Sequence, residues 1–180
     1  MADEPETIEP DCCDARSGRL ERLFGQCRDE ILGTLFYVVG NVEDARDALQ
    51  ETFLKCWHRR HQIDDVQNLR AWVFRIAINT GRDVRKTAWN RRRQTLREDV
   101  PMPSTTESSP DGLVRDEERQ RLRRAISQLP VEQQEVFLMR QNGDLTYCQI
   151  AQAMSLPVGT VKTRMRSAIR QLRETVGDLS

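Results

Sequence analysis

Apolar residues recur at intervals of three and four along the first half of the chain, which is the spacing of one face of an α-helix. The pattern runs from Leu20 to Gly40, a typical helix stop, and a second helix can begin behind Asn41 as its cap. A third stretch follows from Leu69 to Val84. No segment here alternates apolar and polar residues as a half-buried β-strand does. The sequence therefore predicts an all-α fold.

A segment with few apolar residues divides the chain. Residues 99–112 read DVPMPSTTESSPDG, and this mixture of proline, serine, threonine and acids is typical of a linker. A chain of 180 residues has room for two small helical units around such a linker. The expected parts are a disordered acidic N-terminus (1–17), a first helical domain (18–97), a flexible linker (98–116) and a second helical domain (117–180).

The formal net charge is zero because separated blocks of opposite charge cancel. Residues 1–15 carry acids and no base, whereas residues 82–97 carry many bases and one acid, Asp83. The N-terminus lacks the apolar stretch of a secretory signal, and no run approaches the roughly 20 apolar residues of a membrane span. The five cysteines include no C-x-x-C pair, which favours a reducing compartment. We therefore expect a cytoplasmic protein.

The segment TYCQIAQAMSLPVGTVKTRMRSAI, residues 146–169, has the layout of a helix-turn-helix. Thr146 and Gln149 fit a capping box at the start of its first helix. In the second helix the apolar spacing directs Val161, Met165, Ala168 and Leu172 toward the core. The residues left for contact with DNA are Lys162, Thr163, Arg164, Arg166 and Arg170. Taken alone, this basic face also fits a surface that contacts only water.

One cluster of metal-ligand residue types suggests an alternative of another class, a metal-dependent enzyme built on Cys56, His58 and His61. Residues two and three apart on a helix do not converge well on one ion, and Cys56 falls on the apolar stripe beside Phe53 and Trp57. No glycine-rich phosphate loop, carboxylate pair or nucleophile motif supports catalysis. We therefore expect neither a metal nor another cofactor.

Several motifs in a fixed order are more specific than the helix-turn-helix alone. They are EDARDALQETFLKCW (43–57), NLRAWVFRIAINTGRD (68–83), LP (129–130) and LTYCQIAQAMSLPVGTVKTRM (145–165). In this order, with a linker between them, they resemble the extracytoplasmic-function (ECF) group of bacterial RNA polymerase sigma factors. The resemblance implies a transcription initiation factor without catalytic activity or a small-molecule substrate. A helix-turn-helix regulator that works without polymerase is the alternative, and it leaves 43–57 unexplained.

The resemblance implies a role for each helical surface. In the first domain, sigma region 2, the polar face formed by Asp47, Gln50, Glu51 and Leu54 would bind the clamp helices of the polymerase β′ subunit. The −10 promoter element would be melted and held by Arg75, Asn79, Arg82 and Lys86, with Arg91, Arg92 and Arg93 on nearby phosphates. The loop 61–68 together with Asn79 would form a pocket for a flipped base. In the second domain, sigma region 4, the helix-turn-helix would read the −35 element.

The resemblance also implies partners beyond promoter DNA and the clamp helices. These are the polymerase β flap and an anti-sigma factor, which we expect to be anchored in the membrane and to hold the chain there when inactive. Two departures from the family pattern leave specificity open. Ser167-Ala168-Ile169 stands where the family often has Arg-Ala-Arg, and the loop 61–68 lacks the usual glycine and aromatic residues. The promoter bases therefore do not follow from the resemblance.

Overall fold

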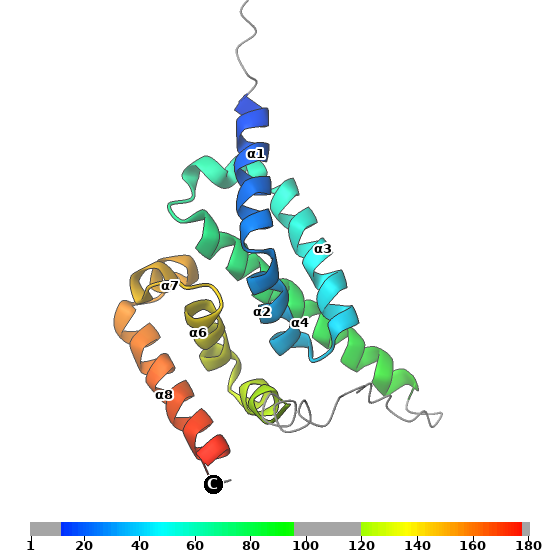
Figure 1. Ribbon diagram of the computed structural model, residues 1–180, viewed down its shortest axis with the longest axis vertical. Coiled ribbons are helices and arrows are strands. Elements are labelled where there is room, and N and C mark those ends of the chain that lie inside the picture. Colours follow the sequence, from blue (N-terminus) through cyan, green and yellow to red (C-terminus); the bar gives the residue numbers. More distant parts are fainter. Residues whose placement is uncertain (1–11, 96–119, 178–180) are drawn as a thin grey trace, which may run out of the picture.

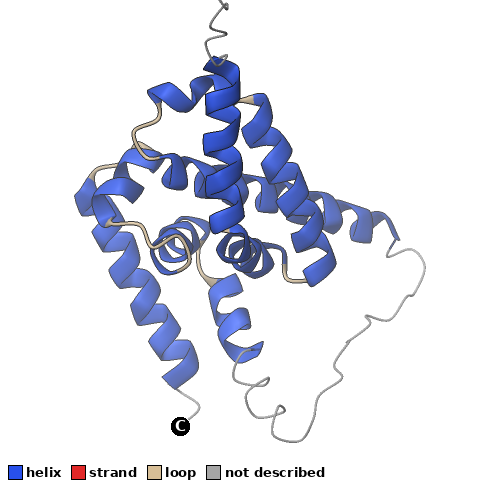
Figure 2. Ribbon diagram, turned by 45° about the horizontal axis from the view of Figure 1, so that its top comes forward, coloured by secondary structure: helices blue, strands red, loops and turns tan. Residues whose placement is uncertain are grey.

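The computed structural model describes residues 12–95 and 120–177, and every regular element in these two ranges is helical (Figures 1 and 2). The first range holds α1 (Cys12–Gln26), α2 (Arg28–Val39), α3 (Val42–His58), the 3₁₀-helix η1 (Arg60–Asp65) and α4 (Leu69–Thr95). The second holds a helix over residues 120–128, α6 (Val131–Gln141), α7 (Tyr147–Met154) and α8 (Val158–Gly177). The predicted all-α fold is confirmed. None of the described helices has the length and apolar character required to cross a membrane.

The N-terminal helices differ from the sequence prediction in two places. The single helix expected from Leu20 to Gly40 is divided at Cys27, whose backbone leaves helical geometry with φ −110° and ψ 19°. Hydrogen bonds from Cys27 N to Leu23 O and from Ile31 N to Cys27 O bridge the break, so the apolar spacing continues through it. Helix α1 also begins at Cys12, inside the segment expected to be disordered. The side chain of Arg16 donates to Asp64 of η1 at 2.5 Å and ties this early turn to the domain.

Helix α4 forms the base of the N-terminal domain and packs against both α2 and α3 (Figure 1). The interior between these helices consists of the buried side chains Ile31, Leu35, Ala45, Ala48, Cys56, Val73, Phe74 and Ala77. The predicted cap is present at the start of α3, where the Asn41 side chain accepts a hydrogen bond from Asp44 N at 2.7 Å. Gly40, at φ 94°, ends α2 in the left-handed conformation that glycine adopts without strain.

Helices α7 and α8 form the predicted helix-turn-helix. Thr146 and Gln149 make a capping box, in which each side chain bonds the backbone N–H of the other residue. The turn is closed by Leu156 N donating to Ala151 O at 2.8 Å, and Ser155 adopts a left-handed conformation at φ 55°. Helix α8 buries the predicted stripe Val161, Met165, Ala168 and Leu172 against α6 and α7.

The two halves of the chain are in contact, because α6 and α7 both pack against α4 (Figures 1 and 2). Helix α4 is therefore covered on two sides. The linker expected at 98–116 lies outside the described residues, so contacts between the helices define how the halves are arranged.

The turn between α6 and α7 gives a test of local packing. A Cβ atom at Gly143 would lie 2.5 Å from the carbonyl oxygen of Met139, and that backbone atom cannot move without disturbing α6. We expect Gly143→Ala to lower the free energy of unfolding by about 1–3 kcal/mol, measured by chemical denaturation. Gly18→Ala in α1 is the control, because nothing lies within 4 Å of its Cβ position. It should raise stability by about 0.5–1 kcal/mol, and equal effects of both variants would contradict the packing argument.

Candidate nucleic-acid interface

A polar stripe runs along α4 through Arg75, Asn79, Arg82 and Lys86, spaced so that all four lie on one face. Arg75, Asn79 and Lys86 are exposed, and Arg82 is partly buried. The structure therefore brings together the four residues predicted to hold the −10 element. Arg91, Arg92 and Arg93 belong to the last turns of the same helix, and their side chains lie outside the described residues.

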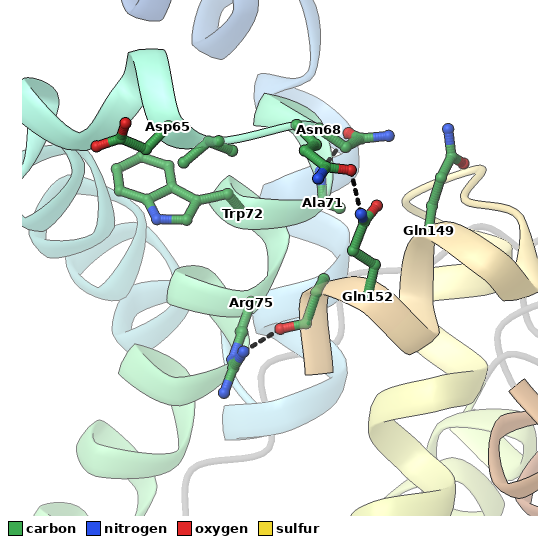
Figure 3. A pocket seen from close by; sticks show the side chains of 10 residues that line it. Asp65, Asn68, Ala71, Trp72, Arg75, Gln149 and Gln152 are labelled. Atoms are coloured by element: carbon green, nitrogen blue, oxygen red, sulfur yellow. Dashed lines mark hydrogen bonds between the residues drawn. The ribbon is translucent and has the colours of Figure 1, made fainter. Parts of the chain in front are cut away.

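A pocket of about 270 Å³ opens at the N-terminal end of this stripe (Figure 3). The half-buried indole of Trp72 and the side chain of Asp65 form one side, and Gln149 and Gln152 of α7 form the other (Figure 3). Between them, the Asn68 side chain accepts a hydrogen bond from Ala71 N at 2.9 Å. Trp72 thus lines the pocket and also packs against the buried core. The size and the mixture of an aromatic face with amides suit a single unstacked base.

Asn79 does not line this pocket. It lies further along α4 in a second hollow of about 400 Å³, which Arg82 and Lys86 also line. The resemblance implies one base pocket built from the loop 61–68 and Asn79 together. Here the loop end at Asp65–Asn68 belongs to the first hollow, and Asn79 belongs to the second.

Two cationic residues of α3 complete the second hollow and were missed by the sequence analysis. Lys55 lies in the last turn of α3 and Arg59 follows the helix as its C-cap, and both line the hollow with the α4 stripe. Lys55 Nζ contacts Glu51 at 2.9 Å and Asp83 at 3.6 Å. Their spacing of four along a helix that packs against α4 was the available signal. The hollow therefore presents cations from two helices, which suits a phosphate backbone.

The C-terminal domain contacts the α4 stripe directly. Arg82 forms an ion pair with Glu135 of α6 at 2.6 Å, and neither side chain is well exposed, at 22% and 14%. Arg75 donates to the carbonyl oxygen of Ala153 in α7 (Figure 3). One turn before it, Arg70 donates from Nε to the carbonyl oxygen of Gly143 at 2.6 Å. No pattern in the sequence marked Arg70 or Glu135 as part of this site.

Glu135 lies in a partly dehydrated and strongly cationic environment. Burial raises the pKa of its carboxyl group, and this effect exceeds the opposing influence of Arg82, Arg164 and Arg75. Arg164 of α8 is thus near enough to Glu135 to affect its pKa, and its side chain is only partly exposed. The remaining predicted −35 residues, Lys162, Thr163, Arg166 and Arg170, are exposed along α8.

The predicted polymerase-binding residues also share an exposed face. Asp47, Gln50, Glu51 and Leu54 point away from the buried side of α3, on which Leu49 and Cys56 lie. Leu54 is 53% exposed, more than the other exposed large apolar side chains among the described residues. The structure therefore brings the four residues together on one exposed face of α3.

The metal cluster is not assembled. Cys56 is fully buried in the core, while His58 and His61 are exposed on the surface. Across the described ranges, no three histidine, cysteine or acidic side chains converge on a point that could hold an ion. Burial raises the pKa of the Cys56 thiol to about 12, so it is a packed apolar group and a poor ligand at neutral pH.

The fold and the interface together define a DNA-binding protein, in which a helix-turn-helix domain accompanies a helical domain with a cationic stripe and a base-sized pocket. Two family models match the chain, Sigma-70 region 2 over residues 23–92 and Sigma-70 region 4 over residues 119–172. The ECF RNA polymerase sigma factor SigL of Mycobacterium tuberculosis is 31% identical over 143 residues, covering 79% of this chain and 80% of SigL. The ECF RNA polymerase sigma factor RpoE of Cereibacter sphaeroides is 30% identical over 155 residues, which cover 84% of this chain and 83% of RpoE. The chain belongs to the ECF family of RNA polymerase sigma factors.

Family membership confirms the resemblance and decides between the hypotheses. The protein is a transcription initiation factor and not a metal-dependent enzyme, and the motif 43–57 has its place in region 2. Solved structures confirm the fold. CnrH in complex with the cytosolic domain of CnrY gives a TM-score of 0.65 at 21% identity, covering 92% of this chain and 94% of that chain. The sigma factor RpoE in complex with the anti-sigma factor NepR from Bartonella quintana gives a TM-score of 0.58 at 20% identity. The match covers 91% of this chain and 98% of that chain.

Burial of the cysteines predicts their reactivity. Cys148 is exposed, whereas Cys27 and Cys56 are buried and their thiol pKa values are raised by burial. At about pH 8, a thiol reagent should label Cys148 rapidly and leave Cys27 and Cys56 unlabelled until the protein unfolds. Peptide mapping by mass spectrometry identifies the labelled residue, and Cys148→Ser is the control. Labelling of Cys56 in the native protein would contradict its place in the core.

Proposed function

We propose that three surfaces of the chain act in transcription initiation. The α3 face binds polymerase, the α4 stripe holds the −10 element and the exposed face of α8 reads the −35 element. The parts are the region 2 domain (18–97), a linker (98–116) and the region 4 domain (117–180). The observation that carries the proposal is the cationic stripe of α4, which ends in the pocket lined by Trp72. Unstacked promoter DNA offers phosphates and flipped bases, and this combination of cations, amides and an aromatic face suits both.

In this proposal the α3 face binds the β′ clamp helices. Its carboxylates and amide offer acceptors and donors, and the exposed Leu54 supplies an apolar contact at the centre of the face. The region 4 domain contacts the β flap and places α8 in the major groove of the −35 duplex. The protein works in the cytoplasm, where polymerase and DNA are present.

An anti-sigma factor is the proposed regulator, held at the membrane in the inactive state. This part rests on the relatives, because solved structures of this fold include RpoE with the anti-sigma factor NepR and CnrH with the cytosolic domain of CnrY. Run-off transcription with core polymerase, on the DNA upstream of the protein's own gene, tests the whole proposal. A transcript that depends on both components supports it, and the absence of a stable complex with core polymerase overturns it.

The α3 face predicts a defect in polymerase binding. Asp47→Arg combined with Gln50→Ala should weaken binding to core polymerase by about tenfold or more, because both residues lie off the buried side of α3 and contribute only to the surface. Asp29→Arg is the control, since it makes the same charge change at a fully exposed site on α2. Affinity is measured by fluorescence anisotropy, with circular dichroism to check the fold. Equal affinity of both variants would remove the clamp-helix assignment.

The α8 face predicts a defect in −35 recognition. Lys162→Ala removes an exposed cation in the first turns of α8 and should cost about 1–3 kcal/mol of promoter binding by the holoenzyme if it contacts a base. Arg173→Ala removes an exposed cation near the other end of the same helix and should have little effect. Binding is compared on promoters with intact and scrambled −35 elements. A loss that is the same on both promoters would make Lys162 a phosphate contact.

A further inference from the structure

A cationic hollow that the −10 assignment does not use lies between α1 and the start of α4. Its volume is about 360 Å³, and its cations are Arg19 and Arg22 of α1 and Arg70 of α4. None of the described residues that line it is acidic. We propose that this hollow binds phosphate groups of the melted promoter strand beyond the pocket that Trp72 lines, toward the transcription start. The inference rests on the proposed function of α4 and extends its DNA-binding surface to α1.

Helical spacing forms the α1 side of the hollow. Arg19 and Arg22 lie three residues apart, so their side chains share one face of α1 with Leu23. Arg16, one turn earlier, donates to Asp64 of η1 at 2.5 Å. This bond and the packing of α1 against η1 hold the helix in place beside the start of α4. The two arginines are therefore presented from a fixed helix face.

The hollow keeps a positive charge that its surroundings do not balance. Both arginines of α1 are exposed, and neither forms an ion pair or a hydrogen bond with another described residue. Arg70 is held by its Nε, which donates to the carbonyl oxygen of Gly143 at 2.6 Å, and its Nη2 lies 3.9 Å from Glu30. One carboxylate at that distance balances at most one of the three positive charges. Guanidinium groups with this excess charge suit phosphate oxygens.

The hollow adjoins the proposed base pocket. Gln67 and Asn68, just before α4, line both of them. The second hollow, which Asn79 lines, lies further along α4 on the other side of the pocket. A strand that follows the stripe and places a base in the pocket therefore passes Gln67 and Asn68 and reaches the arginines of α1 next. Because the promoter is a duplex on its −35 side, this continuing single strand is the one that leads toward the transcription start.

The closing experiment measures binding of the holoenzyme to two forked promoter DNAs. Run-off transcription on the DNA upstream of the protein's own gene maps the promoter, and both forks carry its −35 duplex and its single-stranded −10 element. The short fork ends after the −10 element, and the long fork continues the same strand by about six nucleotides. Arg19→Ala combined with Arg22→Ala is the test variant. Arg28→Ala combined with Arg173→Ala is the matched control, because it also removes two exposed arginines and neither lines the hollow.

We expect both variants to bind the short fork equally, and the test variant to bind the long fork about fivefold more weakly than the control. The slope of log K against log salt on the long fork should become shallower by about 1.4, the value for two phosphate contacts on a single strand. Circular dichroism checks the fold. Equal binding of the long fork by both variants would overturn the proposal, and so would an equal loss on both forks.

A stripe variant separates this site from the −10 assignment. Lys86→Ala should weaken binding of the short fork, because Lys86 is an exposed member of the α4 stripe and does not line the hollow at α1. If Lys86→Ala has no effect, the −10 assignment of α4 fails. A loss confined to the long fork in the test variant supports the phosphate site in either case.

Calorimetric titration of the full-length chain with inorganic pyrophosphate separates DNA from a free phosphate compound. Under the proposal, the affinity of the chain for pyrophosphate is weak and the difference between the two forks is large. Tight binding of pyrophosphate that requires Arg19 and Arg22, without any difference between the forks, would assign the hollow to a free phosphate compound and overturn the assignment to DNA.

Discussion

The packing of helix α4 on two sides is the constraint on which the rest of the structure depends. Against α2 and α3 it contributes Val73, Phe74 and Ala77, whose burial stabilises the N-terminal domain through the hydrophobic effect. On the other side its polar stripe meets α6 and α7. One helix therefore carries both the core of a domain and the surface proposed for nucleic acid. Its cations are held in place by a rigid apolar face, so they are positioned before any ligand arrives.

The two sides of α4 differ in the physical basis of their contacts. The side toward α2 and α3 is apolar, and separating it would expose fully buried side chains such as Phe74 to water. The side toward the C-terminal domain includes the Arg82–Glu135 pair and single hydrogen bonds from Arg70 and Arg75. Next to α4, Arg123 of the C-terminal half also lies over the Phe36 ring of α2, 4.6 Å from its centre. Water and DNA phosphates can replace these polar partners. The domain interface is therefore the place where the molecule can open while each domain stays folded.

Local features of the structure were predictable from the sequence because they depend on residues close together along the chain. The cap at Asn41, the capping box at Thr146 and the buried stripe of α8 all have spacings of three or four. The break at Cys27 was not predictable, since apolar spacing continues through it. The Arg82–Glu135 pair joins positions far apart in the sequence, and neither residue carries a local signal for the other. The residues of the candidate site were thus predicted, but the contact of α6 and α7 with this site was not.

The charge of Glu135 explains how the C-terminal domain can cover the arginines of α4. A neutral apolar patch over α4 would bury Arg75 and Arg82 without partners, which is costly. Here a carboxylate and a backbone carbonyl supply the oxygens that these guanidinium groups require. Burial also raises the pKa of Glu135, which shows that this carboxylate is not in its most favourable environment. The surrounding arginines oppose this effect, so attraction between opposite charges offsets part of the cost of burying the carboxylate.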